Sequence, residues 1–407
     1  MWVRKRIDIG WLDLLSARLN CVLPGSRSVA SREAEAAWSI AGRAFACLSV
    51  RSGLDLLLKS LALPPGSEVL VSALTIPDMV RIIEHHGLVA VPVDLHDQDV
   101  SPRVELLEKV ITKKTKAILV AQLFGSRFDL APFVEFAQQH GLTLIEDCAQ
   151  AFEGERYKGH AEADVSMFSF GPIKTATALG GGMLRVRDEA LLARMRELQA
   201  LYPVQSRWFF LKRVLFYIVL KFLGGRLAFG LFVRTCRLAG KDFNEVLNGS
   251  IRNFPEDEFF LSLRQQPSFP LLRLLARRIR RYRNTDLDRR AARGALLADL
   301  LPPAHCPGAA ARPHSYWIFP LRVDDPPRIV AALREAGFDS TADNSMQPVE
   351  PTDSDSEICA STASALLQSA IYLPLYGEIP ESEIHRMASV LVPLLDVDED
   401  SINPAAL

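Results

Sequence analysis

The residues of this chain that could do chemistry together are a lysine and an aspartate. Lys174 ends the sequence Ser-Phe-Gly-Pro-Ile-Lys and is soon followed by three consecutive glycines, Gly180–Gly182. Asp147 stands twenty-seven residues upstream, where a short apolar run ends. A lysine amine can form a Schiff base with an aldehyde, and a carboxylate can keep a pyridine nitrogen protonated. The pair therefore predicts a pyridoxal 5'-phosphate (PLP) site, although either residue alone would more often be an ordinary solvated side chain.

The elements that must position this pair alternate between short apolar runs and helical patterns, as in a mainly parallel sheet. Strands are predicted at Glu68–Ala73, Val89–Asp94, Ala117–Leu123, Thr143–Asp147, Ser166–Phe170 and Met183–Arg187. Helices are predicted at Gly53–Leu61, Asp78–His86, Arg103–Val110, Leu130–His140 and Asp188–Leu198. Asp147 would then stand at the carboxyl end of a strand, where ligand sites of α/β proteins gather.

Composition and pattern divide the chain into five parts. They are an N-terminal segment at 1–40, a large domain at 41–240, a linking helical region at 241–305, a small domain at 306–396 and a tail at 397–407 that we expect to be disordered. In the small domain, a strand is predicted at Tyr316–Val323 and helices at Pro327–Ala336 and Glu381–Leu394. The polar segment Gln347–Thr362 is interpreted as an active-site loop or a mobile surface turn.

The ordered set of motifs resembles the DegT/StrS-type aminotransferases, PLP enzymes best known for aminating keto sugars on nucleotide carriers. The similar stretches are Ser49–Leu58, Pro65–Val69, Ile111–Ile118, Glu146–Ala151, Phe168–Phe170 and Lys174, then His314–Trp317 and Tyr372–Leu375. Together they cover about residues 30–200 and 305–395. The resemblance implies a fold-type I PLP-dependent transferase: an α/β large domain with a mainly parallel, seven-stranded-type sheet, a smaller C-terminal α/β domain, and a homodimer.

The resemblance also implies roles for individual residues. Lys174 looks like the Schiff-base lysine that afterwards acts as acid and base, and Asp147 like the partner of the pyridine nitrogen. Gln150 would lie beside the phenolic oxygen or the ring face, and Ser169 would donate to the phosphate. Ser52, at the start of a predicted helix, would add a hydroxyl and a backbone N–H to the phosphate, because helix N-termini favour anions.

Two of the carried-over positions depart from the family pattern. Where the family usually reads Gly-Thr, this chain has Val50 and Arg51, so that the guanidinium of Arg51 either binds the phosphate or points at solvent. Where the family commonly places an aromatic ring over the cofactor, this chain has Ile76. An aliphatic side chain can pack on the ring but forgoes about 0.5–1.5 kcal/mol of stacking.

Three further residues are candidates for contacts with the substrate or a partner subunit. Arg252 and Asn253 are the nearest counterparts of a family segment that reaches the partner's cofactor phosphate. His314 precedes the first strand of the small domain, where it either belongs to a buried aromatic strand start or faces the substrate across the cleft.

An apolar, basic insert at Trp208–Leu238 is the feature that the family does not explain. Its charged residues are all positive, and its uninterrupted apolar pieces are shorter than the roughly 20 residues that span a bilayer. It either packs on the large domain or a second subunit, or lies at a membrane surface. A second basic stretch, Arg273–Arg293, is expected to be a solvated helix that links the domains, with binding of an anionic substrate or headgroup as the alternative.

The composition narrows the function class. The 407 residues include 47 basic and 48 acidic ones, which gives no nucleic-acid signature. Six cysteines and eight histidines show no metal-ligand spacing, so that we expect no metal site and reduced thiols in a cytoplasmic protein, peripheral at the inner membrane face if the insert binds lipid. The N-terminus lacks the features of a signal peptide.

Together these observations predict a PLP-dependent aminotransferase. Its amino donor would be an amino acid, L-glutamate by resemblance, and its acceptor a nucleotide- or lipid-linked keto sugar. Some relatives carry histidine in place of the lysine and dehydrate or deoxygenate sugars, so that Lys174 favours transamination. The alternatives are a PLP-binding regulatory or membrane-associated protein without turnover, and a PLP enzyme of another reaction type acting on a lipid-like substrate.

Overall fold

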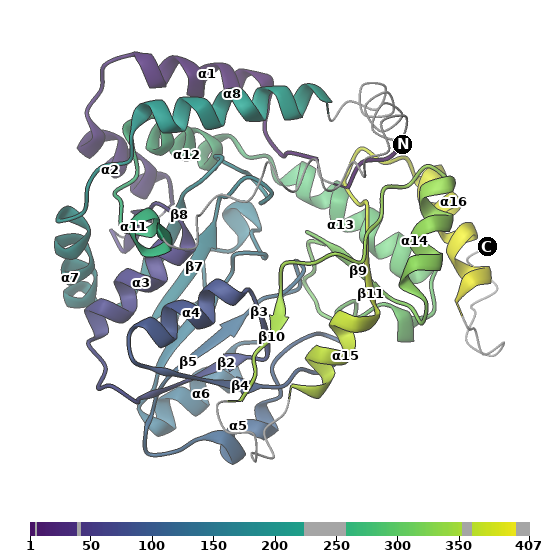
Figure 1. Ribbon diagram of the computed structural model, residues 1–407, viewed down its shortest axis with the longest axis horizontal. Coiled ribbons are helices and arrows are strands. Elements are labelled where there is room, and N and C mark those ends of the chain that lie inside the picture. The colour runs from purple at the N-terminus through teal and green to yellow at the C-terminus, as the bar shows by residue number, and fades with distance from the viewer. Residues whose placement is uncertain (5, 39–41, 224–257, 352–359, 396–407) are drawn as a thin grey trace.

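A seven-stranded sheet forms the centre of the large domain in the computed structural model, which describes residues 1–4, 6–38, 42–223, 258–351 and 360–395 (Figure 1). The strand order is β1-β8-β7-β6-β5-β2-β4, and only β8 runs against its neighbours. The strands are β1 (Ala44–Cys47), β2 (Glu68–Ser72), β4 (Val89–Val93), β5 (Thr115–Ala121), β6 (Thr143–Asp147), β7 (Val165–Ser169) and β8 (Gly182–Val186). The prediction of a mainly parallel α/β sheet is therefore confirmed.

Helices cover both faces of the sheet, and the alternation of strand side chains decides what each face meets. Val71 and Leu119 pack with α3, α4 and α7, whereas Leu70 and Ile118 pack with α5 and α6. These helices are α3 (Val50–Leu61), α4 (Pro77–His85), α5 (Val104–Val110), α6 (Ala131–His140) and α7 (Glu189–Ala200). Strands that are buried on both faces explain the continuous apolar runs of the sequence.

A further group of helices lies over the β1 and β8 end of the sheet (Figure 1). It comprises α1 (Trp11–Val22), α2 (Arg27–Trp38), α8 (Arg207–Leu223) and α12 (Phe269–Arg281), while the short α11 (Phe259–Leu263) packs beside α3. The arginines of α12 form ion pairs with Glu33 and Asp13 of the first two helices. The prediction that the basic stretch Arg273–Arg293 is mainly solvated is wrong for α12, because its arginines pair with acids that lie more than 200 residues away in the sequence.

The small domain is built around two antiparallel strands, β9 (Phe319–Arg322) and β11 (Ala370–Leu373). Its helices are α13 (Asn284–Asp299), α14 (Pro326–Glu335), α15 (Ser361–Ser369) and α16 (Glu381–Leu391). The first strand begins three residues later than predicted, after Tyr316, whose φ of 45° is incompatible with a strand. The N-terminal segment joins this domain as well, because the Trp2 N–H donates to the Gly337 carbonyl.

Two predicted segments cross the boundary of the described residues. The polar segment at 347–362 contributes β10 (Gln347–Pro348), which pairs with β3 (Leu74–Thr75) of the large domain. Residues 352–359, the predicted tail, and the part of the insert after Leu223 lie outside the described residues, as do Arg252 and Asn253.

Candidate active site

Asp147 lies at the carboxyl end of β6, in the middle of the sheet. Its Oδ1 accepts a hydrogen bond from the Ala149 N–H at 2.8 Å. Glu146 points to the opposite face, where Tyr157 and Gln122 donate to its carboxylate. The Glu146 carboxylate is therefore occupied by hydrogen bonds within the protein, whereas Asp147 is the acid that lies at the sheet edge.

Lys174 lies in the loop between β7 and β8, which internal hydrogen bonds hold tightly. The Phe170 carbonyl accepts from the N–H groups of Ala178 and Gly180, and the Ala176 N–H donates to Asp8 at 2.8 Å. Ala176 also adopts a φ of 56°, a left-handed conformation that non-glycine residues rarely take. A loop that retains such a residue is fixed by its surroundings, which gives the lysine amine a defined place.

The electrostatics of Lys174 and Asp147 are linked. Burial lowers the pKa of Lys174 to about 7; the carboxylate of Asp147 works against this shift, and the cation of Arg51 adds to it. Burial raises the pKa of Asp147, and the Ala149 N–H and Lys174 oppose that rise. An amine with a pKa near neutrality is available as a nucleophile and as a base, which an ordinary exposed lysine is not.

Trp317 is the functional candidate that the sequence reasoning passed over. The Lys174 ammonium lies over its indole ring, 3.9 Å from the ring centroid, and the Trp317 Nε1–H donates to the Ile173 carbonyl at 3.1 Å. The small domain thus supplies one wall of the lysine site. In the sequence, Trp317 appeared only as part of a buried aromatic strand start, and no local signal could show that its ring returns to a loop more than 140 residues upstream.

The N-terminus of α3 lies at the same edge of the sheet. Ser49 caps this helix: its side-chain oxygen accepts from the Ser52 N–H, and the two hydroxyls are 3.0 Å apart. Gly182 makes the approach possible, because a Cβ there would lie 2.9 Å from backbone atoms of Ser49 and Val50. Ser52 is where the prediction placed it, although its own N–H is already used by the cap.

Arg51 points from the first turn of α3 toward the first turn of α4. Its Nε lies 2.6 Å from the Asp78 carboxylate, and the side chain is about one-third exposed. The sequence left two interpretations of Arg51: its side chain binds the phosphate, or it simply points at solvent. The ion pair with Asp78 contradicts the second interpretation. The guanidinium nevertheless acts on the Lys174 amine electrostatically, so that it lies at the edge of the same site.

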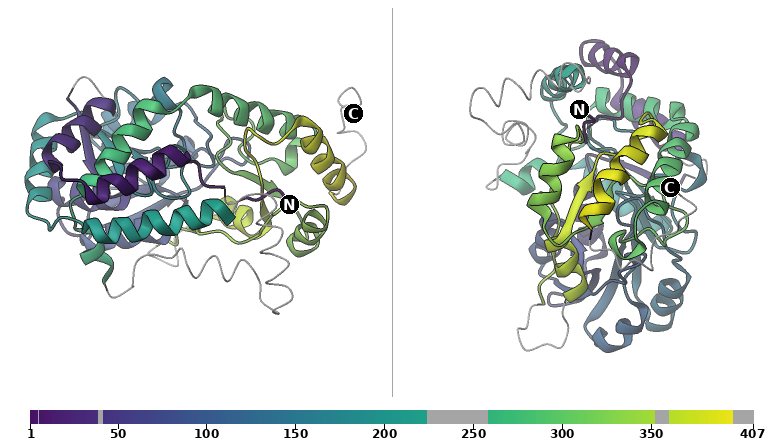
Figure 2. Two further views of the ribbon diagram at one scale, coloured as in Figure 1. Left: turned by 90° about the horizontal axis from the view of Figure 1, so that it is seen from above. Right: turned by 90° about the vertical axis from the view of Figure 1, so that its right-hand side faces the viewer.

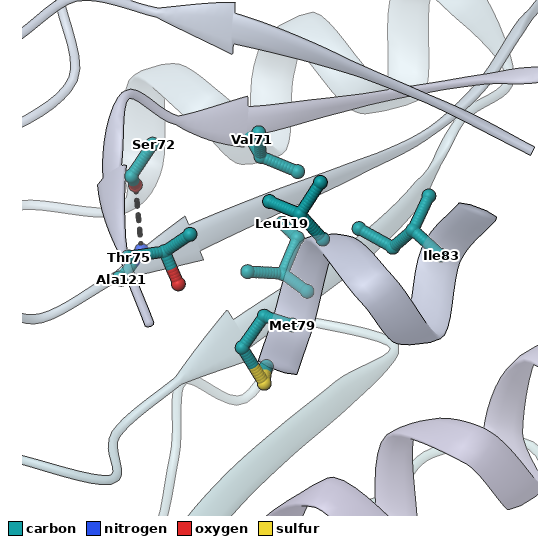
Figure 3. A pocket seen from close by; sticks show the side chains of 8 residues that line it. Val71, Ser72, Thr75, Met79, Ile83, Leu119 and Ala121 are labelled. Carbon is teal, nitrogen blue, oxygen red and sulfur yellow. Dashed lines mark hydrogen bonds between the residues drawn. The ribbon is translucent and has the colours of Figure 1, made fainter. Parts of the chain in front are cut away.

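Ile76 immediately precedes α4 and follows Thr75, which lines a small apolar pocket (Figure 3). The pocket lies between the ends of β2 and β5 and is lined by Val71, Ser72, Thr75, Met79, Val80, Ile83, Leu119 and Ala121. The Ser72 hydroxyl accepts from the Ala121 N–H at 2.8 Å and joins the two strand ends. This packing fixes the start of α4, and with it the backbone at Ile76.

The remaining predicted residues have defined surroundings. Gln150 accepts from the Phe124 N–H at 2.8 Å, and Ser169 ends β7 two residues before Gly171, whose N–H approaches its hydroxyl at 3.5 Å. His314 is buried: its Nδ1 accepts from the Tyr316 N–H, and the two rings stack 3.8 Å apart. Burial lowers the pKa of His314 to about 3, so that it is neutral at physiological pH. A role for His314 toward substrate stays a prediction.

The residues present fit PLP. The site combines a lysine amine with a lowered pKa, a carboxylate at the sheet edge, hydroxyls of Ser52 and Ser169, and the N-terminus of a twelve-residue helix. Amine, carboxylate and helix N-terminus are the chemical partners that an aldehyde, a pyridine nitrogen and a phosphate require. The fold and this site are those that the sequence predicted for a fold-type I PLP-dependent transferase.

Solved structures share this fold over most of the chain. The aminotransferase TlmJ from Streptoalloteichus hindustanus superimposes with a TM-score of 0.68 at 19% identity, over 96% of this chain and 98% of that chain. The Escherichia coli GDP-4-keto-6-deoxy-D-mannose-3-dehydratase with bound hydrated PLP also reaches 0.68, at 12% identity and over 96% and 99% of the two chains. At these identities the likeness shows the fold.

Sequence comparison finds a family resemblance over the N-terminal half of the chain. Residues 22–208 match the DegT/DnrJ/EryC1/StrS aminotransferase family. The GDP-perosamine synthase of Caulobacter vibrioides is 35% identical over 171 residues, 41% of this chain and 46% of that protein; the one of Escherichia coli is 39% identical over 144 residues, 35% and 39% of the two. The match thus spans less than half the length of either curated relative. Residues 22–208 of this chain thus resemble the DegT/DnrJ/EryC1/StrS aminotransferases, in agreement with the resemblance that its motifs predicted.

Proposed function

We propose that this protein is a PLP-dependent aminotransferase that moves an amino group from an amino acid to the carbonyl carbon of a keto sugar. The observation that carries the proposal is the placement of Lys174, whose shielded amine has a pKa of about 7 and interacts with Asp147 at the carboxyl edge of the sheet. A lysine whose pKa lies near neutrality supports a role in proton exchange in addition to cofactor binding.

The residues of the site divide the work of transamination. When bound, PLP supplies a conjugated ring that accepts the electrons released at the donor's α-carbon. Lys174 would take the proton from that carbon and deliver it to the carbon that the cofactor's aldehyde supplies, since about half of an amine with a pKa near 7 is neutral at pH 7. Asp147, as a carboxylate, would hold the positive charge at the ring nitrogen.

Two other groups bind and enclose rather than exchange protons. The N-terminus of α3, with the Ser52 hydroxyl and the cation of Arg51 beside it, would hold the phosphate. Trp317 covers the Lys174 amine from the small domain, which orients it and limits its contact with water. Proton exchange at a carbon atom is faster when competing solvent is excluded.

The names of matched relatives support a nucleotide-linked keto sugar as the acceptor. They include a UDP-N-acetyl-3-dehydro-alpha-D-glucosamine 3-aminotransferase and a dTDP-3-amino-3,4,6-trideoxy-alpha-D-glucose transaminase, each 36% identical over part of its length. A lipid-linked keto sugar is the other form of the same substrate class. L-Glutamate is the donor that we propose, and the resemblance to the family is its support.

A half-reaction tests the proposal without knowledge of the acceptor. The PLP-loaded protein should release 2-oxoglutarate when mixed with L-glutamate and leave the cofactor in its amino form. The Lys174→Ala variant should bind PLP but release none. Retention of PLP with no oxoacid from glutamate, or from a panel of other amino acids, would instead favour a PLP-binding protein without turnover.

A further inference from the structure

Helices α1 and α8 lie side by side on one outer side of the large domain (Figure 2). Both helices expose apolar side chains to solvent. Of the sixteen large apolar side chains exposed among the described residues, ten belong to these two helices. They are Trp11, Leu12, Leu15, Leu19 and Val22 of α1, and Trp208, Phe209, Leu215, Val219 and Phe222 of α8. We call this surface the α1–α8 platform.

The exposed positions form one stripe along each helix. On α8, Trp208, Leu215, Val219 and Phe222 recur at intervals of three, four or seven residues, which places them on one face. The opposite face is already filled, because Phe210, Val214 and Tyr217 are buried in the core of the large domain. The apolar stripe is therefore not needed to hold α8 in place, and a contiguous patch of this kind marks an interaction surface.

The charges of the platform have a single sign. The exposed charged side chains of the two helices, both fully described, are Arg18 and Lys212, and the partly exposed ones on α8 are basic as well. The one acid, Asp13, is buried and paired with Arg277 and Arg278. An apolar surface whose exposed charges are all positive complements an anionic partner.

Aromatic and basic side chains are paired at both ends of the platform. The Lys221 ammonium lies 5.5 Å from the Trp11 ring centroid at one end, and that of Lys212 lies 5.8 Å from the Trp208 ring at the other. The guanidinium of Arg207 donates to the Leu23 carbonyl, which shows that the two helices run antiparallel. Tryptophan, phenylalanine and leucine on one face with lysine and arginine beside them is the composition of helices that lie in a membrane interface.

We propose that the α1–α8 platform docks this protein on the surface of an anionic lipid bilayer. The apolar stripes would enter the boundary between headgroups and acyl chains, and the cations would meet the lipid phosphates. Docking is parallel to the surface, since none of the helices in the described parts of the chain is long and apolar enough to cross a bilayer. A second copy of this chain fits less well, because a symmetric contact would bring two all-cationic surfaces together with no exposed acid on either helix to pair them.

Vesicle co-flotation tests the platform directly. The PLP-loaded full-length protein is mixed with phosphatidylcholine vesicles, with and without phosphatidylglycerol. Leu15→Gln, Leu19→Gln and Val219→Gln are combined in one variant, and Leu261→Gln, which alters an exposed leucine on α11, is its matched control. We expect the wild type and the control to float with the anionic vesicles, and the combined variant to bind at least about tenfold more weakly.

A second set of variants tests the contribution of the cations of the platform to vesicle binding. Arg18→Gln with Lys212→Gln should weaken binding to anionic vesicles and reduce its sensitivity to salt, whereas Lys109→Gln with Lys113→Gln, in and after α5, should not. Circular dichroism and PLP content confirm that each variant is folded.

Two results would overturn the proposal. The first is wild-type protein that does not float with anionic vesicles. The second is equal binding by wild type and folded platform variants. If the wild type does not bind vesicles and the combined variant has a lower molecular mass in solution than the wild type, the platform is a contact between copies of this chain.

Discussion

Replacing Asp147 by asparagine should lower the pKa of Lys174 below its present value of about 7, and replacing Arg51 by glutamine should raise it. The two variants change the charges that act on the amine in opposite directions while leaving burial, the main cause of the shift, in place. A nearby charge typically moves a pKa by about 1–3 units. We expect about one unit in each direction, equivalent to about 1.4 kcal/mol, because both partners retain some solvent contact.

The assay is pH-dependent acetylation of the PLP-free protein, followed by mass spectrometry of the peptide that contains Lys174. About half of an amine with a pKa of 7 is neutral at pH 7, which is about 1,600-fold more than for a lysine with the ordinary value of 10.5. Exposed Lys109 serves as the internal reference in the same digest. Titration of Lys174 along the Lys109 curve in all three proteins would refute the electrostatic reasoning.

Three further outcomes follow from other contacts. Trp317→Leu should reduce kcat by about tenfold, because the Lys174 amine loses the ring that orients it; the glutamate half-reaction measures the effect. Gly182→Ala should lower the thermal midpoint and weaken PLP binding, since its Cβ would collide with the start of α3 at 2.9 Å; spectroscopic PLP titration measures the loss. Burial works to raise the pKa of Asp55, but hydrogen bonds from His86 and Arg264 lower it to about 2, so that this carboxylate contributes about 2 kcal/mol of stability above pH 4, lost as the pH falls toward 2. Arg264→Met should therefore destabilise the protein at pH 7 and flatten the acid limb of its denaturation profile.

The sequence predicted the elements of the large domain closely because their signals are local. The strand Thr143–Asp147 has the predicted bounds, and its continuous apolar run reflects burial on both faces. The helix expected from Gly53 begins at Val50 instead, because Ser49 caps it, a signal that was present in the sequence. Boundaries are the least certain part of any such prediction.

The contacts that complete the site could not be predicted in this way. Trp317 reaches the Lys174 amine only because the small domain folds back on the loop, and Arg51 turns to Asp78 because two helix starts lie side by side. Only one of the two helices of the α1–α8 platform could be predicted from the sequence, since the apolar stripe of α8 lies in the predicted insert. Its other half, α1, pairs with α8 across nearly 200 residues of sequence.

Reduction of the PLP-loaded protein with borohydride, followed by peptide mapping, tests the central claim most directly. We expect a single phosphopyridoxyl group, on Lys174. We also expect the wild-type protein to lose this label when it is incubated with L-glutamate before reduction. A label on another lysine, or a Lys174 label that no amino donor removes, would contradict the assignment of Lys174 as the residue that binds the cofactor and serves transamination.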